Sequence, residues 1–252
     1  MLGIDFGGSY ADCVVSKKGR ILFSYSTPAK DFEEKKLFSE IESRGLLFGG
    51  IRVTGMRKRL QKKFKRVGEI ESIALGARVL SREKDFVAAS VGTGTAIAAF
   101  KNQKAFHAGG TAVGGGTLEG LSRLLLGCNA VQAHALALKG RSVLDISVGD
   151  IAGGRVGMVP GNATASNFGA AAKNARKQDV AKSLFNMVGE TAGVCASLAA
   201  QKTGVRKAVF VGRASAFPLI RTSAERACKL YSVKAVFPEN GELATALGAS
   251  LQ

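Results

Sequence analysis

The chain opens with three short runs in which apolar residues either alternate with polar ones or follow one another directly. Gly-Gly-Ser and Lys-Lys-Gly-Arg separate these runs, and such sequences form turns, so the pattern predicts a three-stranded meander. A helical spacing of apolar residues then begins at Asp31, the expected N-cap. The predicted strands are 2–6, 11–16, 20–27 and a strand region at 46–48 and 51–53, and the predicted helices are 31–44 and 69–80.

The same order of patterns restarts near residue 86. The predicted strands are 86–91, 95–100, 105–108, 208–212 and 233–237, and the predicted helices are 115–126, 130–138, 177–203, 216–230 and 241–251. Alternation of strands and helices favours an α/β fold with helices covering the sheets. We therefore expect two halves, 1–80 and 81–252, with the final helix packing back on the first half and a ligand cleft between them.

Glycine clusters follow the first strand of each half. The first is Gly7-Gly8-Ser9, the second is Gly92-Thr93-Gly94, and a third spans 109–117 before an apolar helical pattern. Glycine lets backbone N–H groups approach a phosphate, hydroxyls add donors, and a helix N-terminus attracts anions. Two such loops, one in each half, predict that the two halves together hold a single polyphosphate, as in a nucleotide-dependent phosphotransferase or ATPase.

Several polar residues near these clusters are candidates for the chemistry. Asp5, at a strand end beside the first loop, is placed to hold Mg²⁺ directly or through water. Glu69 and Glu71 begin a predicted helix, where a carboxylate can act as a general base, but periodicity alone favours two acids that stabilise the first turn. His107 is equally consistent with a structural and a functional role, and Gly212 ends a strand in a turn of the kind that can cradle an adenosine.

Composition excludes several classes of protein. Of the 252 residues, 46% are hydrophobic and 22% are charged, which are globular values. No apolar run approaches a membrane span, and a strand begins at once, so we expect a soluble cytoplasmic protein without a signal peptide. The four cysteines are widely separated and only two histidines are present, which disfavours a zinc or iron–sulfur site and favours free thiols.

The net charge of +17 needs a separate explanation. Its densest source is the run 57–66, where Leu60 and Phe64 are spaced as on one face of a helix. We interpret this run as a helix with a solvated basic face. Nucleic-acid binding is disfavoured because no aromatic residues interleave the basic ones, whereas attraction of anionic small molecules suits the charge.

These motifs taken together resemble those of the type II pantothenate kinases. The matching segments are Gly3–Ser9, Glu69–Glu71 with Gly76, Val91–Thr95, Gly109–Gly110, Gly114–Leu121, Pro160–Gly161, Ala165–Gly169, Phe210–Gly212, Glu239–Gly241 and Leu247–Ala249. The resemblance runs from end to end and implies two ribonuclease-H-like halves of the actin/hexokinase/Hsp70 superfamily. It also implies ATP and Mg²⁺ as cofactors, a homodimer, and coenzyme A or acyl-CoA as further partners.

The resemblance implies roles for individual residues. Asp5 and Gly7 to Ser9 would contact phosphates and Mg²⁺, and Glu69 would activate the hydroxyl of pantothenate for attack on the γ-phosphate of ATP. The further cofactor-binding residues would be Gly92, Thr93, Gly94, Gly114, Gly115, Gly116 and Gly212. The substrate-binding residues would be His107, Gly110, Thr111 and Asn167.

Two positions depart from the family pattern. Asp12 stands where the family usually has a lysine, which replaces a phosphate-facing cation by an acid. His107 stands where the family has an arginine, and it lacks the bidentate fork of that side chain. Another small-molecule acceptor, or a non-catalytic nucleotide- or acyl-CoA-binding regulator, are therefore the alternatives to pantothenate phosphorylation. Cations that can compensate for Asp12 are Lys101, Lys104 and Arg213.

Overall fold

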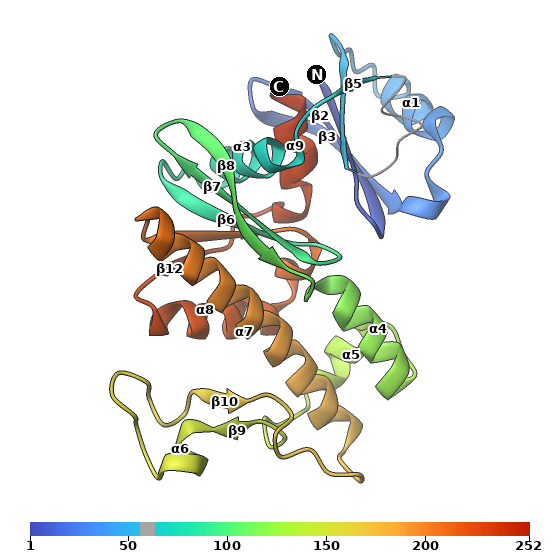
Figure 1. Ribbon diagram of the computed structural model, residues 1–252. Coiled ribbons are helices and arrows are strands. Elements are labelled where there is room, and N and C mark those ends of the chain that lie inside the picture. The colour runs from blue at the N-terminus through green and yellow to red at the C-terminus, as the bar shows by residue number, and fades with distance from the viewer. Residues whose placement is uncertain (56–63) are drawn as a thin grey trace.

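Two five-stranded sheets with one shared topology form the frame of the molecule (Figure 1). The computed structural model describes residues 1–55 and 64–252. The first sheet has the order β3-β2-β1-β4-β5, and the second has the order β8-β7-β6-β11-β12. The first contains β1 (Leu2–Phe6), β2 (Tyr10–Lys17), β3 (Arg20–Pro28), β4 (Ile51–Gly55) and β5 (Lys65–Arg66). The second contains β6 (Phe86–Val91), β7 (Thr95–Lys101), β8 (Lys104–Thr111), β11 (Lys207–Val211) and β12 (Lys234–Val236).

The strand directions repeat as well. In each sheet the first three strands form an antiparallel meander, and the last two run parallel to the first strand. The α/β class and the duplication of architecture that the sequence predicts are thereby confirmed. Since equivalent strands occupy equivalent places, the turn after β1 and the turn after β6 are topological counterparts.

Side-chain alternation decides which helices cover the first sheet. Leu2, Ile4 and Phe6 point to one face, where they pack against α1 (Glu34–Glu42). Gly3 lies on the opposite face, against the backbone of α9 (Ala244–Ser250). Asp5, two residues further along β1, therefore faces the same side as Gly3, toward the second half of the molecule.

The second sheet is buried on both faces. Val87 and Ala89 face the long helix α7 (Lys177–Thr203) and α8 (Pro218–Leu230), whereas Phe86 and Ala88 face α3 (Glu69–Ser81). Strands covered on both sides are expected to be largely apolar, and in β6 every residue except Ser90 is apolar.

Helices α3 and α9 lie between the two sheets in Figure 1 and cross each other closely. Although α3 follows the first sheet in the sequence, its residues Ile73 and Ala77 pack on the second. Although α9 ends the chain, its residues Ala246 and Leu247 pack against Val14 of the first sheet. Each half thus contributes a helix to the other, which ties the two halves together.

The remaining elements extend away from the first sheet (Figure 1). Helices α4 (Gly115–Leu126) and α5 (Ala130–Ala137) pack on the first half of α7 through a core that includes Leu118, Leu184 and Phe185. Beyond them lie β9 (Ile146–Ser147), α6 (Val148–Ala152) and β10 (Thr164–Ser166), where β9 and β10 form a two-stranded sheet.

Several predicted elements are wrong in detail. The predicted helix 31–44 is a 3-10 turn, η1 (Ala29–Asp31), followed by α1, whose N-cap is Glu33 and not Asp31. No strand forms at 46–48. Of the predicted basic helix, 57–63 lie outside the described residues, and Lys65 and Arg66 form β5. The isolated basic run has the spacing of a helix, but its last residues gain hydrogen bonds by pairing with β4.

The structure also contains elements that the sequence analysis missed or placed differently. The short elements β9, α6 and β10 are too brief to have a detectable periodicity. Strand β11 ends one residue before Gly212, because this glycine has a φ of +84° and leaves the sheet. Two predicted helices begin as 3-10 turns, η2 (Arg213–Ala216) and η3 (Gly241–Leu243), and Pro218 and Ala244 then start α8 and α9.

Candidate active site

Three side chains gather where β1 and β4 end and α3 begins. Asp5 on β1 pairs in register with Thr54 on β4, so both side chains point to one face of the sheet. Glu69 is the first residue of α3 and lies close enough to Asp5 for their charges to interact. A cavity of about 340 Å³ opens here, and it is lined by Thr54, Gly55, Arg66, Val67, Gly68 and Glu69.

The donor set fits a hydrated Mg²⁺ ion. Thr54 Oγ1 is buried and has no hydrogen-bond partner among the described residues, which is unusual for a buried hydroxyl. The described part of the chain has no group of three or more His, Cys, Asp or Glu side chains able to hold a metal by themselves. Mg²⁺ needs no such cage, because it keeps several waters and binds one or two carboxylates together with substrate phosphates.

The environment of Asp5 disfavours a negative charge in the ligand-free protein. Burial, followed by the nearby carboxylates Glu69 and Asp12, raises the pKa of Asp5 to about 7. A bound cation would reverse this effect, since it favours the ionised carboxylate. The site is therefore arranged to take up positive charge.

Asp5→Asn is expected to stabilise the ligand-free protein increasingly as the pH rises from 5 to 8. Unfolded Asp5 ionises near its ordinary pKa of 3.8, whereas folded Asp5 holds its proton to about pH 7. Ionisation hence costs stability as the pH rises, with an upper bound of about 4 kcal/mol for a shift of three pH units. Thermal unfolding of both proteins at pH 5 and pH 8 measures the difference. An equal difference at both pH values would contradict the raised pKa.

The first and second glycine loops face each other across the two halves. Ser9 Oγ lies 3.4 Å from Thr93 Oγ1, and a Cβ added at Gly8 would lie 2.8 Å from the same Thr93 oxygen. Gly7, Gly8 and Ser9 are exposed, as is Thr93, while Gly92 and Gly94 are half-buried. Loops 84 residues apart thus meet at one point, and exposed hydroxyls of both halves are available to a shared ligand.

The third glycine cluster uses its backbone to brace the second loop. The N–H groups of Gly115 and Gly116 donate to the carbonyls of Gly92 and Thr93, at 2.7 and 2.9 Å. A Cβ at Gly114 would lie 2.6 Å from the Gly94 backbone. These contacts explain why glycines stand at the start of α4, because only residues without a side chain allow its backbone to lie this close to the second loop. The amides of Gly115 and Gly116 are already occupied.

Gly212 and Arg213 approach both loops from β11. A Cβ at Gly212 would lie 2.8 Å from the Val91 backbone, immediately before the second loop. Arg213 reaches the first half, where its Nη2 donates to Asp12 Oδ1. Asp12 also accepts a hydrogen bond from Ser26 Oγ. Desolvation raises the pKa of Asp12, and the contacts with Ser26 and Arg213 oppose that rise.

Three of the four predicted substrate residues lie on β8. His107 is exposed and pairs with Ala98, and a bulge separates this pair from Gly109 and Ile97. Bulges redirect side chains and are frequent beside functional sites. Gly110 and Thr111 follow at the end of β8, next to the second loop, where Thr111 Oγ1 accepts the N–H of Val113.

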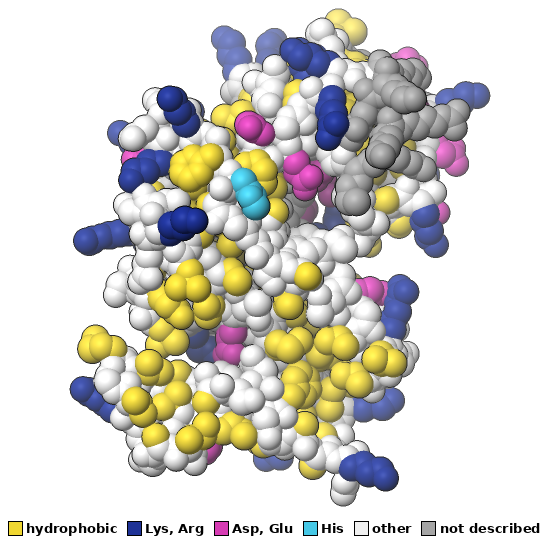
Figure 2. Space-filling view, viewed as in Figure 1, with side chains coloured by type: hydrophobic (Ala, Val, Ile, Leu, Met, Phe, Trp, Pro, Cys, Tyr) yellow, Lys and Arg dark blue, Asp and Glu magenta, His cyan; other side chains and the backbone are white. Residues whose placement is uncertain are grey.

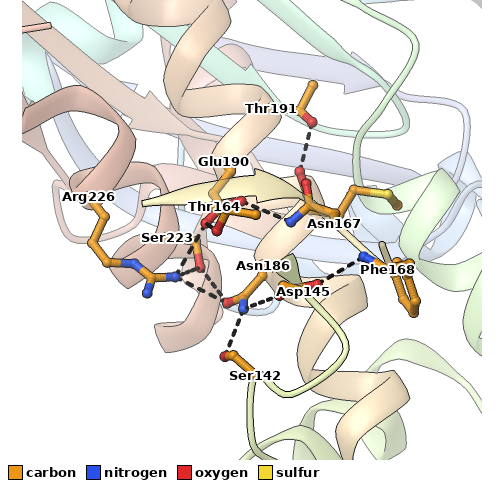
Figure 3. A network of polar contacts seen from close by, with 11 residues as sticks. Ser142, Asp145, Thr164, Asn167, Phe168, Asn186, Glu190, Thr191, Ser223 and Arg226 are labelled. Atoms are coloured by element: carbon orange, nitrogen blue, oxygen red, sulfur yellow. Dashed lines mark hydrogen bonds and ion pairs between the residues drawn. The ribbon is translucent and has the colours of Figure 1, made fainter. Parts of the chain in front are cut away.

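Asn167 lies in a different part of the molecule, against α7 and α8 (Figure 3). Its Nδ2 donates to Glu190, which also accepts from Thr164 Oγ1 and contacts Arg226. A cavity of about 510 Å³ adjoins this network, and its lining includes Thr164, Asn167, Glu190, Cys195 and Arg226. The structure therefore does not bring Asn167 together with the glycine loops or with Glu69.

A second set of polar contacts in Figure 3 fixes the loop that carries Asn167. The buried Asn186 donates to Ser142 and Asp145 and accepts from Ser223. Asp145 in turn accepts the backbone N–H of Phe168, a residue with a φ of +58°. Satisfied buried networks of this kind specify one conformation, so the polar loop has a defined shape.

The sequence analysis overlooked several residues of both cavities. Thr54 and Arg66 line the first, and Glu190 and Arg226 line the second. Strand β4, with the sequence Ile-Arg-Val-Thr-Gly, contains two polar residues, so its sequence did not single out Thr54. Arg66 was noted only as the last residue of the basic run, Glu190 and Arg226 stood out in no motif, and only the fold places all three at the cavities.

The state of the cysteines agrees with the expectation from composition. All four cysteines are free thiols, and burial raises the pKa of Cys228 and Cys195. Across residues 1–55 and 64–252, no helix combines the length and apolar character that crossing a bilayer requires.

A family model and individual related proteins both assign the chain to the same family. A family model described as Fumble matches residues 85–252. The chain is 31% identical over 230 residues to a type II pantothenate kinase of Bacillus anthracis, covering 84% of this chain and 82% of that protein. It is 30% identical over 195 residues to one of Staphylococcus haemolyticus, covering 72% of this chain and 73% of that protein.

Solved structures resemble the whole chain. The ADPNP-bound activator of 2-hydroxyisocaproyl-CoA dehydratase from Clostridium difficile has a TM-score of 0.74 at 16% identity, covering 100% of this chain and 92% of that one. A ROK family glucokinase from Streptomyces griseus, with glucose and AMPPNP, has a TM-score of 0.60 at 16% identity, covering 99% and 97%. At such identities the likeness establishes the fold, which is the predicted actin-like ATPase fold.

Proposed function

The chain belongs to the Fumble family, the type II pantothenate kinases, and from this membership we propose that it phosphorylates pantothenate with ATP. The product would be 4′-phosphopantothenate, formed in the first step of coenzyme A biosynthesis. The observation that carries the proposal is the position of Glu69, which lines a cavity and lies beside Asp5, near the end of the strand that leads into the first glycine loop.

Glu69 would act as the general base. It would accept the proton of the pantothenate hydroxyl as that oxygen bonds to the γ-phosphorus and the bond from the γ-phosphorus to the bridging oxygen of ADP breaks. Its position at the start of α3 leaves the carboxylate exposed to the cavity. Arg66, on the same cavity wall, supplies a positive charge for an anionic acceptor.

The nucleotide would lie between the two halves. Gly7 to Ser9 and Gly92 to Gly94 would contact its phosphates, and Gly212 would approach its adenosine. Asp5, with Thr54 beside it, would hold Mg²⁺, which neutralises charge on the transferring phosphoryl group. We place the boundary between the halves near residue 80.

Pantothenate-dependent release of ADP is expected from the purified protein with ATP and Mg²⁺. A coupled ADP-release assay measures it, and omission of pantothenate provides the background rate. Because Mg²⁺ is part of the proposal, chelation is expected to reduce the rate to that background. ADP release that does not depend on pantothenate would contradict the proposed acceptor.

A second candidate is phosphorylation of another small-molecule acceptor. It is favoured by His107, which is exposed on β8 and replaces the arginine expected there from the family resemblance. A panel of hydroxy acids, amino alcohols and sugars in the same assay distinguishes the two candidates. Turnover with one of these and not with pantothenate would select the second.

We also propose a cytoplasmic homodimer. Exposed hydrophobic side chains gather over the part of the molecule distant from the first sheet in Figure 2. They include Leu124, Val131 and Leu138 of the α4–α5 region, Ile151 of α6, and Met158 beyond α6. Apolar surface on this scale is typical of protein contacts. Acyl-CoA or coenzyme A are further proposed ligands. Sedimentation equilibrium tests the dimer, and a monomer at micromolar concentration would contradict it.

A further inference from the structure

Arg213 joins the two halves beside the glycine loops. It follows Gly212 at the end of β11, yet its guanidinium contacts Asp12 and Tyr10 of β2. Nη2 lies 2.5 Å from Asp12 Oδ1, and the guanidinium carbon lies 3.9 Å from the centre of the Tyr10 ring. An ion pair and a cation–π contact thus hold one arginine in a single place.

This place lies between the two loops. Tyr10 and Asp12 continue directly from the turn of Gly7 to Ser9. On the other side, Ala214 lies 3.3 Å from a Cβ added at Gly115, whose N–H braces the second loop. The other two candidate cations are elsewhere. Lys101 stands at the opposite end of β7 from the loop, where it donates to Thr203, and Lys104 follows it beyond the turn.

The hydrogen-bonding capacity of Arg213 is incompletely used. Its Nε is buried and has no partner in the described part of the chain. A guanidinium carries five N–H donors, and a buried donor without a partner is costly. The pair is also asymmetric, because the side chain of Asp12 is 11% exposed and that of Arg213 is 38% exposed. Asp12 is therefore nearly buried and can hold the guanidinium in position, whereas part of the Arg213 side chain remains accessible to a ligand.

We propose that Arg213 binds the β- or γ-phosphate of the nucleotide, with Asp12 and Tyr10 holding it in position. The proposal deepens the proposed function, on whose nucleotide site it rests. Asp12 stands where the family pattern has a lysine, so the first half lacks that positive charge beside the phosphates. Arg213, from the second half, supplies a positive charge in its place. An arginine suits this task because its planar fork matches phosphate oxygens.

The test compares ligands that differ in phosphates. Arg213→Ala is expected to weaken binding of AMPPNP by about 10- to 100-fold, the range of a charge-assisted hydrogen bond, and to leave adenosine binding unchanged. Isothermal titration calorimetry measures both. Arg213→Lys keeps the charge and loses the fork, so a smaller loss is expected for AMPPNP alone. Arg206→Ala, an exposed arginine just before β11, is the matched control for net charge and is expected to bind as wild type.

Two results would overturn the proposal. One is AMPPNP affinity within twofold of wild type in both Arg213 variants. The other is an equal loss for AMPPNP and adenosine, which would assign Arg213 a merely structural role between the halves. Because no acceptor is present in the titration, a protein that binds AMPPNP through Arg213 but fails to phosphorylate pantothenate would refute the proposed function and support this inference.

Discussion

Glu69→Gln is expected to lower pantothenate-dependent turnover by at least about 100-fold, because general bases contribute about 10²- to 10⁴-fold to such reactions. Glutamine has nearly the same size as glutamate but cannot accept the hydroxyl proton. Binding of the nucleotide is expected to remain near wild type, since the glycine loops and Arg213 lie on other elements. The ADP-release assay measures turnover, and calorimetry with AMPPNP measures binding.

Glu71→Gln provides the matched control. Glu71 carries the same charge in the same first turn of α3, but its carboxylate folds back over the N-cap Gly68. If both glutamates only stabilise the helix N-terminus, the two variants will have similar turnover and similar small losses of stability. A large loss of turnover in Glu69→Gln alone assigns the base. Wild-type turnover in that variant would remove Glu69 from the mechanism.

The sheets and loops were predictable because their signals are local. Short, nearly continuous apolar runs at residues 2–6 and 86–91 indicate buried strands, and a glycine turn after each marks where the chain leaves the sheet. The topological equivalence of the two halves then requires that these turns lie at corresponding places. What the spacing of residues could not supply was the role of Glu69, which came from the family resemblance.

The missed features depend on contacts between distant segments. Arg213 is 201 residues from Asp12, and nothing in the short sequence around either indicates the pair. Similarly, α3 and α9 have ordinary amphipathic patterns that do not tell which sheet they cover. Only the assembled fold shows that each covers the sheet of the other half.

Glycine illustrates how one sequence signal has two physical meanings. At Gly8 the absence of a side chain leaves space next to the exposed Thr93, whereas at Gly114 and Gly115 it permits backbone contact with the second loop. The third cluster was predicted to bind phosphate on the same grounds as the first. Its amides are already engaged, so bracing of the second loop is a sufficient reason for these glycines.

Gly248→Ala is expected to destabilise the protein by about 3 kcal/mol or more, at the upper end of the usual overpacking cost. A Cβ at Gly248 would lie 1.8 Å from the carbonyl oxygen of Ser72, and one at Gly76 would lie 1.8 Å from that of Ala244. Both contacts are with backbone atoms, which no rotamer change can relieve. Relief therefore requires α3 and α9 to separate.

Gly120→Ala is the matched control, because this glycine also lies in a helix but a Cβ there meets nothing within 4 Å. It is expected to raise stability by about 0.5 to 1 kcal/mol through helix propensity. Urea unfolding followed by circular dichroism measures both changes. Equal midpoints for Gly248→Ala and wild type would show that the helices do not approach so closely. Since α3 begins at Glu69, separation of the two helices would also displace the proposed base. Stability and turnover are therefore expected to fall together in Gly248→Ala. Neither is expected to fall in Gly120→Ala.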